Sequence, residues 1–149
     1  MLINPVPGAM PSTTTAAPAD NSSKKPDGTP SAELVCVVDD DQAVRDSLRI
    51  LLESADFFVL TYASGREFLA DEQGRRAGCL IIDQHMTGMD GLTTVGTLYQ
   101  SGPKVPTILI TGRLDAEIAA CAVELGVIAV LEKPFPATQL LDLVRTSGG

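Results

Sequence analysis

The chain has 149 residues, which is enough for one domain of ordinary size. Its 11 basic and 19 acidic residues give a net charge of −8, and no run of basic residues offsets that charge. A surface of this sign repels nucleic-acid phosphates, so we do not expect this chain to bind DNA or RNA directly.

The cysteine content indicates a reducing compartment. Cys36, Cys79 and Cys121 are odd in number and far apart, which argues against a disulfide framework. They are expected to be small core residues, because no zinc-binding spacing is present and His85 is the only histidine. No apolar run reaches membrane-spanning length, and the first ten residues do not resemble a signal peptide. We therefore expect a cytoplasmic protein without a membrane partner.

The composition divides the chain into two parts. Residues 1–31 are rich in Pro, Ser, Thr, Ala and Asp and contain no aromatic residue. Such a segment cannot bury enough apolar surface to offset its conformational entropy, so it is predicted to be a disordered tail. Residues 32–149 are predicted to form the folded domain.

Apolar strands and amphipathic helices alternate through this second part. The first predicted strand is residues 34–38, and a helix follows from about Gln42 with apolar residues at helical spacing. The second predicted strand is residues 57–61. Ser64 is predicted to cap the second helix, because Glu67 three residues later completes a capping box.

The alternation continues from the third predicted strand, residues 79–82. A loop rich in Gly and Met then leads to a helix near residues 92–99. The fourth predicted strand is residues 105–110, and the helix after it, about residues 115–125, is expected to end at Gly126.

The fifth predicted strand, residues 127–131, and a last helix from about Pro136 complete five strand–helix units. Strands that are apolar throughout are typical of a parallel sheet covered on both faces. Five units in about 118 residues suit an open doubly wound sheet, because a closed eightfold barrel needs about twice that length. We predict an α/β, flavodoxin-like fold with five parallel strands in the order 2-1-3-4-5.

Polar residues stand where these strands end. In such sheets, ligands bind beyond the carboxyl ends of the strands, at the point where the strand order reverses. That point lies between the first and third strands, so Asp39, Asp40 and Asp83 are predicted to converge there. Thr111 follows the fourth strand and Lys133 the fifth, which adds a hydroxyl and an ammonium group to the same edge.

This set of groups predicts phosphoryl transfer. Three carboxylates repel each other, and an uncompensated site would raise the pKa of at least one. Mg²⁺ is the expected compensation, and a lysine and a hydroxyl can bind phosphate oxygens. One carboxylate can then be the nucleophile and form an aspartyl phosphate. In the alternative interpretation, residues 39–41 only cap the first helix, and Thr111 and Lys133 are solvated loop residues.

Four segments in chain order resemble the receiver domain of two-component response regulators, over about residues 33–146. They are VVDDDQAVRDSL, LIIDQHMTGMDGL, LITGR and LEKPF. The resemblance is closest to receivers that precede a helix-turn-helix output domain, through ITG and EKPF. It implies that Asp83 is the phosphoacceptor, that Thr111 bonds the phosphoryl oxygen, and that Lys133 pairs with it. It also implies a cis peptide between Lys133 and Pro134.

The resemblance also implies a set of metal ligands. Asp39 and Asp40 correspond to the acidic pair that holds Mg²⁺, with Asp40 as the direct ligand. Asp83 and the backbone carbonyl of His85 would complete the protein ligands. The imidazole of His85 is expected either to face solvent or to affect access of water to the acyl phosphate, and Arg113 is another candidate for that effect.

Two positions depart from the family pattern. The loop after the acceptor has Thr87 where the family has proline. Val130 stands where the family has Tyr or Phe, whose ring swings inward when the threonine hydroxyl moves to the phosphoryl group. Valine has no such ring. We therefore expect intact phosphorylation chemistry with an altered relay, in which the backbone of the loop after Thr111 moves.

The implied partners are a histidine kinase or phosphotransfer protein, which phosphorylates Asp83, and a downstream protein target. We expect the chain to assist its own phosphorylation and dephosphorylation without being a turnover enzyme on an external substrate. A stand-alone receiver is the favoured interpretation. A fragment of a longer DNA-binding regulator and a degenerate, phosphorylation-independent binding module are the alternatives. An aspartyl phosphatase is disfavoured because Gln84-His85 follows Asp83 without a second carboxylate, and three aspartates after strand one would repel a flavin phosphate.

Overall fold

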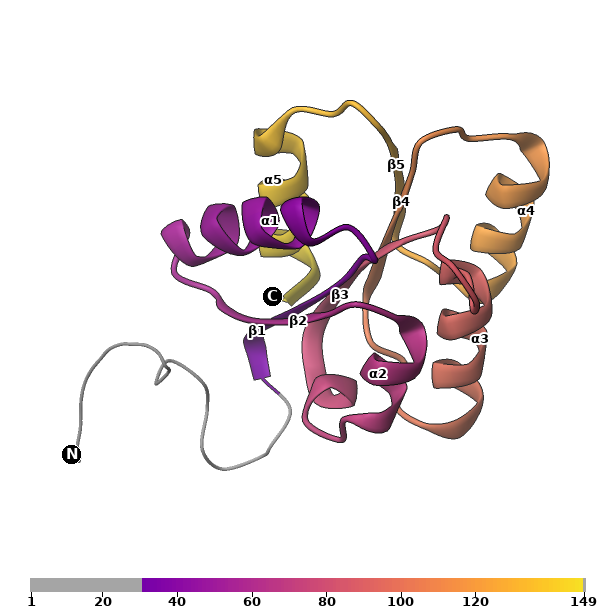
Figure 1. The fold of residues 1–149 in the computed structure, drawn as a ribbon, viewed down its shortest axis with the longest axis horizontal. Helices are drawn as coiled ribbons and strands as arrows, with labels where there is room; N and C mark the ends of the chain where they lie inside the picture. Colours follow the sequence, from indigo (N-terminus) through magenta and orange to yellow (C-terminus); the bar gives the residue numbers. More distant parts are fainter. Residues whose placement is uncertain (1–30, 149) are drawn as a thin grey trace.

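The computed structural model describes residues 31–148, in which five strands form one sheet with helices on both sides (Figure 1). The strands are β1 (Ser31–Val38), β2 (Phe58–Tyr62), β3 (Ala77–Asp83), β4 (Thr107–Thr111) and β5 (Ala129–Glu132). The helices are α1 (Gln42–Ser54), α2 (Gly65–Ala70), α3 (Gly91–Ser101), α4 (Ala116–Leu125) and α5 (Ala137–Gly148), with a 3₁₀ turn, η1, at Gly74–Arg76. The predicted disordered tail lies outside the described residues, except that its last residue, Ser31, begins β1.

The sheet has the predicted topology. Its strand order is β2-β1-β3-β4-β5, and every neighbouring pair is parallel. The direction of winding reverses between β1 and β3, where Val38 is paired with Ile82. The doubly wound, flavodoxin-like prediction is therefore confirmed, and the carboxyl ends of β1 and β3 lie side by side.

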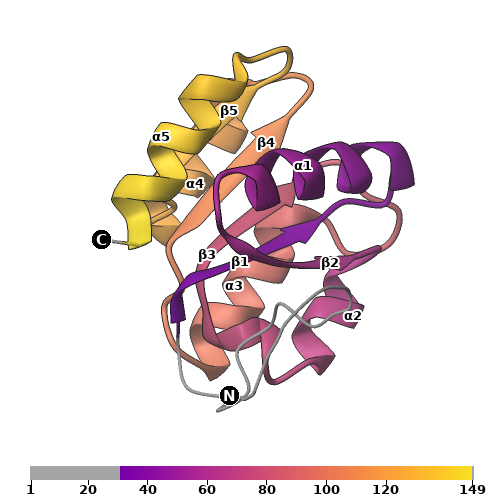
Figure 2. The same ribbon diagram turned by 90° about the vertical axis from the view of Figure 1, so that its left-hand side faces the viewer.

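Two helical layers cover the sheet (Figures 1 and 2): α1 and α5 lie on one face, and α2, α3 and α4 on the other. Alternate residues of β1 belong to the two corresponding cores. Val37 packs in the core that contains Leu52 of α1 and Leu140 of α5. Cys36 packs in the opposite core with Phe68 of α2. The strands are apolar throughout because both of their faces are buried.

β1 and β3 begin earlier than predicted, at Ser31 and Ala77, whereas β4 and β5 begin later, where backbone N–H groups are missing or already used. β4 begins at Thr107 rather than residue 105, and Pro106 just before it has no N–H to give to a ladder. β5 begins at Ala129, because the N–H of Val127 bonds to Ala122 and so belongs to the end of α4. Gly126 ends α4 as predicted, in the left-handed conformation with φ of 84°.

The three cysteines are free, with Cys36 and Cys79 buried and Cys121 half-buried, as expected for core residues. Burial raises the pKa of the Cys36 thiol to about 12 and that of the Cys79 thiol to about 11. Both buried thiols are therefore protonated at neutral pH and unreactive. Among the helices of residues 31–148, none is long and apolar enough to cross a membrane.

Candidate functional site

An acidic cluster lies at the reversal point of the sheet. β3 ends at Asp83, and Asp39 and Asp40 follow the last residue of the neighbouring strand β1. One carboxylate oxygen from each of the three lies within 4.8 Å of the other two. Asp39 and Asp83 are buried, whereas Asp40 is exposed. The predicted convergence of the three side chains is confirmed.

The clustering of three carboxylates affects the pKa of Asp39. Its pKa is raised, first by burial of the carboxylate and also by the negative charge of Asp83. The backbone N–H of Asp41 donates to Asp39 Oδ1 over 2.9 Å, which opposes the rise in pKa. The guanidinium of Arg45 donates to the Asp39 carbonyl over 2.7 Å and fixes the turn that leads into α1.

The helix-capping interpretation is correct for one aspartate of the three in sequence. Asp41 is the N-cap of α1, and its Oδ1 accepts the N–H of Ala43 over 2.9 Å. The carboxylates of Asp39 and Asp40 belong instead to the cluster with Asp83. Three consecutive aspartates therefore perform two different tasks.

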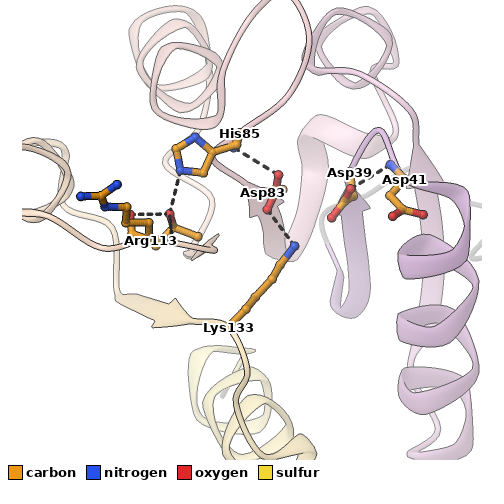
Figure 3. Close-up of polar contacts among 7 residues, drawn as sticks. Asp39, Asp41, Asp83, His85, Arg113 and Lys133 are labelled. Atoms are coloured by element: carbon orange, nitrogen blue, oxygen red, sulfur yellow. Dashed lines mark hydrogen bonds and ion pairs between the residues drawn. The ribbon is translucent and has the colours of Figure 1, made fainter.

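Asp83 has a donor on each carboxylate oxygen (Figure 3). Lys133 Nζ lies 3.2 Å from Oδ1, and the backbone N–H of His85 donates to Oδ2 over 3.1 Å. The backbone N–H of Lys133 bonds to the Thr111 carbonyl over 2.9 Å, and the peptide from Lys133 to Pro134 is cis, as the resemblance implied. Lys133 lies in the loop after β5 and is exposed, but it is more than a solvated loop residue, because its ammonium group pairs with a buried carboxylate.

Thr111 is the last residue of β4 and is fully buried, so it is not a solvated loop residue. Its hydroxyl donates to the Arg113 carbonyl over 3.0 Å and accepts the Arg113 N–H over 3.1 Å. His85 Nε2 lies 3.0 Å from the same oxygen. His85 is exposed, as one of the two expectations for its ring had it, but the ring does not face solvent alone, because its tip bonds to the hydroxyl of Thr111.

The loop after β3 is closed by Gln84, which sequence reasoning treated only as a non-acidic neighbour of Asp83. The Gln84 side-chain oxygen accepts the N–H of Leu92 over 2.8 Å, and its carbonyl accepts the N–H of Gly91 over 3.1 Å. A Cβ at Gly91 would lie 2.6 Å from the carbonyl oxygen of Asp83. Glycine at 91 is therefore required for the start of α3 to lie against the end of β3. The glycine is visible in the sequence segment MDGL. The short distance that makes it necessary is seen only in the structure.

The same loop reaches back to the acidic cluster. The backbone N–H of Thr87 donates to Asp40 Oδ2 over 3.1 Å, and its hydroxyl lies 3.5 Å from the same oxygen. A proline at this position would have no N–H to donate. The departure from the family pattern at residue 87 therefore adds a contact to the cluster.

The donor set of the cluster fits a hard divalent cation. Mg²⁺ binds oxygen ligands at about 2.0–2.1 Å, so oxygens on opposite sides of the ion are about 4 Å apart. The three carboxylate oxygens lie within 4.8 Å of one another, and side-chain rotations that shorten these separations would let all three bind one ion. The carboxylates of Asp39, Asp40 and Asp83 could thus hold such an ion, with water or phosphate oxygens in its remaining positions.

A family model for the response regulator receiver domain matches residues 35–145. The chain belongs to this family. The receiver is 34% identical over 113 residues to the transcriptional regulatory protein FixJ of Bradyrhizobium diazoefficiens, in a match that covers 76% of this chain and 55% of that protein. It is 37% identical over 119 residues to the transcriptional regulatory protein TdiR of Thauera aromatica, with 80% of this chain and 52% of that protein covered.

A solved structure of the chemotaxis protein CheY4 of Vibrio cholerae matches the receiver with a TM-score of 0.71 at 28% identity, over 76% of this chain and 97% of that chain. The receiver chain spans about half the length of the curated relatives it matches. What these comparisons share with it is the receiver domain of two-component systems.

Val130 marks the second departure of this receiver from the family pattern. It lies on β5, paired with Leu109, and is half-buried against the core on the α2–α4 side. No aromatic ring is therefore present at this position to follow a movement of Thr111.

Proposed function

We propose that Asp83 accepts a phosphoryl group from a histidine kinase or phosphotransfer protein, with Mg²⁺, and that this changes a surface that binds a downstream protein target. One observation carries the proposal. The carboxylate of Asp83 is clustered with those of Asp39 and Asp40 and is also paired with the ammonium group of Lys133. A nucleophile, a cation site and a phosphate-binding charge are thus present at one strand end.

The transfer balances as a displacement at phosphorus. A carboxylate oxygen of Asp83 forms a bond to phosphorus, the bond from phosphorus to the donor's imidazole nitrogen breaks, and the leaving nitrogen keeps the electron pair. Asp39, Asp40, Asp83 and the His85 carbonyl would hold Mg²⁺, which neutralises charge on the transferring group when it is bound. The N–H of His85, which bonds to Asp83 in this structure, fixes the orientation of the carboxylate.

Lys133 and Thr111 act on the phosphoryl oxygens. The ammonium group of Lys133 lies 3.2 Å from Asp83 Oδ1 and would pair with a phosphoryl oxygen bonded there. The hydroxyl of Thr111 would donate to a second oxygen. Hydrolysis of the acyl phosphate by water returns Asp83 to its free form, so the chain resets a signal and is not a turnover enzyme on an external substrate.

The output of the switch is proposed to be a protein contact in the cytoplasm. The net charge of −8 opposes direct contact with nucleic acid. As part of a longer DNA-binding regulator, the same switch would act on an attached output domain. A degenerate receiver would bind its target without phosphorylation, which the paired donors on Asp83 disfavour.

Phosphorylation by acetyl phosphate with Mg²⁺, followed by intact mass, tests the proposal. The wild type is expected to gain one phosphoryl group that is labile to hydroxylamine, and Asp83→Asn is expected to gain none. Asp41→Asn is the matched control, because asparagine also caps a helix and Asp41 lies outside the cluster. Equal labelling of Asp83→Asn and wild type would refute the assignment of Asp83, and an unlabelled wild type would favour the degenerate receiver.

A further inference from the structure

The hydroxyl of Thr111 has no hydrogen-bonding capacity left in this structure. A hydroxyl has one hydrogen to donate and two lone pairs to accept with. The hydrogen is directed to the Arg113 carbonyl, 3.0 Å away, and one lone pair accepts the Arg113 N–H at 3.1 Å. With these two bonds made, the remaining contact, to His85 Nε2 at 3.0 Å, requires the tautomer in which the imidazole donates.

The hydrogen bond from His85 restrains the side chain of Thr111, which would donate to a phosphoryl oxygen on Asp83. Figure 3 shows the ring of His85 directed away from the carboxylate of Asp83, although the main chain of His85 lies beside it. To donate to a phosphoryl oxygen on Asp83, Thr111 must withdraw its hydrogen from Arg113. If Thr111 reaches the phosphoryl oxygen by a change of χ1, whose staggered positions are about 120° apart, its oxygen also leaves His85 Nε2.

We propose that the imidazole of His85 is a positioning residue for Thr111. It holds the threonine hydroxyl in the orientation bonded to Arg113 while Asp83 is unphosphorylated, and it loses this partner when Thr111 turns to the phosphoryl group. This inference rests on the proposed phosphorylation of Asp83. It gives the receiver a side chain that responds to Thr111 although Val130 provides no ring.

The residues around His85 and Thr111 allow the turn of Thr111 to be reversed, and they connect it to α4. His85 is exposed, so its ring can bond to water once Thr111 has turned. Arg113 loses two hydrogen bonds in the same event. The next residue, Leu114, donates its N–H to Glu132 Oε2 over 2.9 Å, and α4 begins two residues later. The turn of Thr111 therefore removes the hydrogen bonds that hold Arg113, while the bond from Leu114 to Glu132 still holds the part of the loop next to α4.

His85 is the only histidine in the chain, so its ring nitrogens give one unambiguous set of NMR signals. They can be measured at constant pH through the carbon-bound ring protons, in the full chain. Thr111→Val is expected to change the Nε2 shift, because it removes the hydroxyl acceptor. Thr97→Val makes the same change on the exposed part of α3 and is expected to leave the shift unaltered.

Mg²⁺ with beryllium fluoride, a mimic of the phosphoryl group, is then added to the wild type. We expect the ring shifts to move toward those of Thr111→Val, together with changes in the backbone amides next to Asp83. If those amides change and the ring does not, the role of His85 is refuted and the phosphoacceptor assignment survives. If neither changes, both proposals are overturned.

Two further variants separate this role from a merely structural one. His85→Ala removes the restraint on the free state and is expected to bind beryllium fluoride roughly twofold to tenfold more tightly. His85→Gln places an amide N–H the same number of bonds from the backbone and is expected to restore wild-type affinity. Equal affinities for the two variants, or no effect of alanine, would refute the proposal.

Discussion

The backbone N–H of Thr87 donates a hydrogen bond to the carboxylate of Asp40, 3.1 Å away. This contact joins the loop after β3 to the exposed member of the acidic cluster. It holds the Asp40 carboxylate near two other negative charges, where repulsion would otherwise turn the side chain toward solvent. The cluster is thus partly organised for a cation before one binds.

Replacing Thr87 with proline is expected to weaken Mg²⁺ binding by roughly threefold, because the donor that orients Asp40 is lost. Isothermal titration calorimetry on the unphosphorylated chain measures the change in Kd. Thr87→Ala is the matched control, since it keeps the N–H and removes only the hydroxyl at 3.5 Å. Equal Kd values for the proline and alanine variants would show that the N–H does not organise the site.

Gly91→Ala is expected to damage both stability and phosphorylation. Its Cβ would lie 2.6 Å from the Asp83 carbonyl oxygen, so either β3 or α3 must move. We expect the free energy of unfolding to fall by about 2 kcal/mol and acetyl phosphate labelling to slow, as measured by chemical denaturation and intact mass.

Gly96→Ala provides the comparison on the same helix. The nearest atom to its Cβ would be 3.8 Å away, an ordinary contact, so alanine is expected to stabilise α3 by up to about 1 kcal/mol. A similar loss of stability in both variants would mean that replacing either glycine of α3 is destabilising, rather than that Gly91 in particular fixes the end of β3.

Lys133→Met is expected to lower the free energy of unfolding by about 1 kcal/mol without Mg²⁺, because it leaves the buried Asp83 facing other carboxylates. The effect is modest since the Lys133 side chain is 38% exposed and water screens its charge. Thermal unfolding with increasing Mg²⁺ should reduce the deficit, because the ion supplies positive charge to the same cluster. Lys104→Met, which removes a cation above the ring of Tyr99, should show no such dependence on Mg²⁺.

Asp39→Asn is expected to stabilise the metal-free protein at neutral pH. Because burial raises the pKa of Asp39 above its ordinary value of 3.8, the folded protein holds this proton more tightly than the unfolded chain. The contribution of this carboxyl to stability is therefore most favourable at low pH and declines as the pH rises through the window that begins near 3.8.

Thermal unfolding at several pH values in a chelator measures this effect. The gain of Asp39→Asn over wild type should be largest at neutral pH and disappear below the ordinary pKa, where both side chains are neutral. Asparagine retains the oxygen that accepts the Asp41 N–H, so packing is conserved. Asp41→Asn should lack this pH-dependent gain, and an equal gain there would indicate a general effect of net charge.

Much of the fold could be predicted because its signals are local. Residues such as Val37 and Ile81 lie in strands buried on both faces, and burial of that kind produces the continuous apolar runs seen in the sequence. The end of α4 at Gly126 was visible because a left-handed residue there favours glycine. The convergence of Asp39 and Asp83 followed from the strand order alone, since parallel strands end at one edge.

The hydrogen bonds of the site could not be predicted in this way. The contact of His85 with Thr111 joins residues 26 positions apart, and that of Thr87 with Asp40 joins residues 47 positions apart. Both depend on how a short loop turns after β3, and no periodic pattern encodes that turn. The sequence also could not show that Asp40 joins the acidic cluster while Asp41 caps α1, because the two identical residues differ only in the direction of their side chains.

The placement of every proposed site residue at the carboxyl edge of the sheet leaves the amino edge free to vary. The connection between α3 and β4 illustrates this, since residues 102–104 are exposed and lie at the end of the strands remote from Asp83. Chain ends could be relocated to this connection, or a reporter peptide inserted there, without touching the acidic cluster. The receiver therefore has its proposed chemistry at the carboxyl edge of the sheet and can accommodate sequence changes at the amino edge.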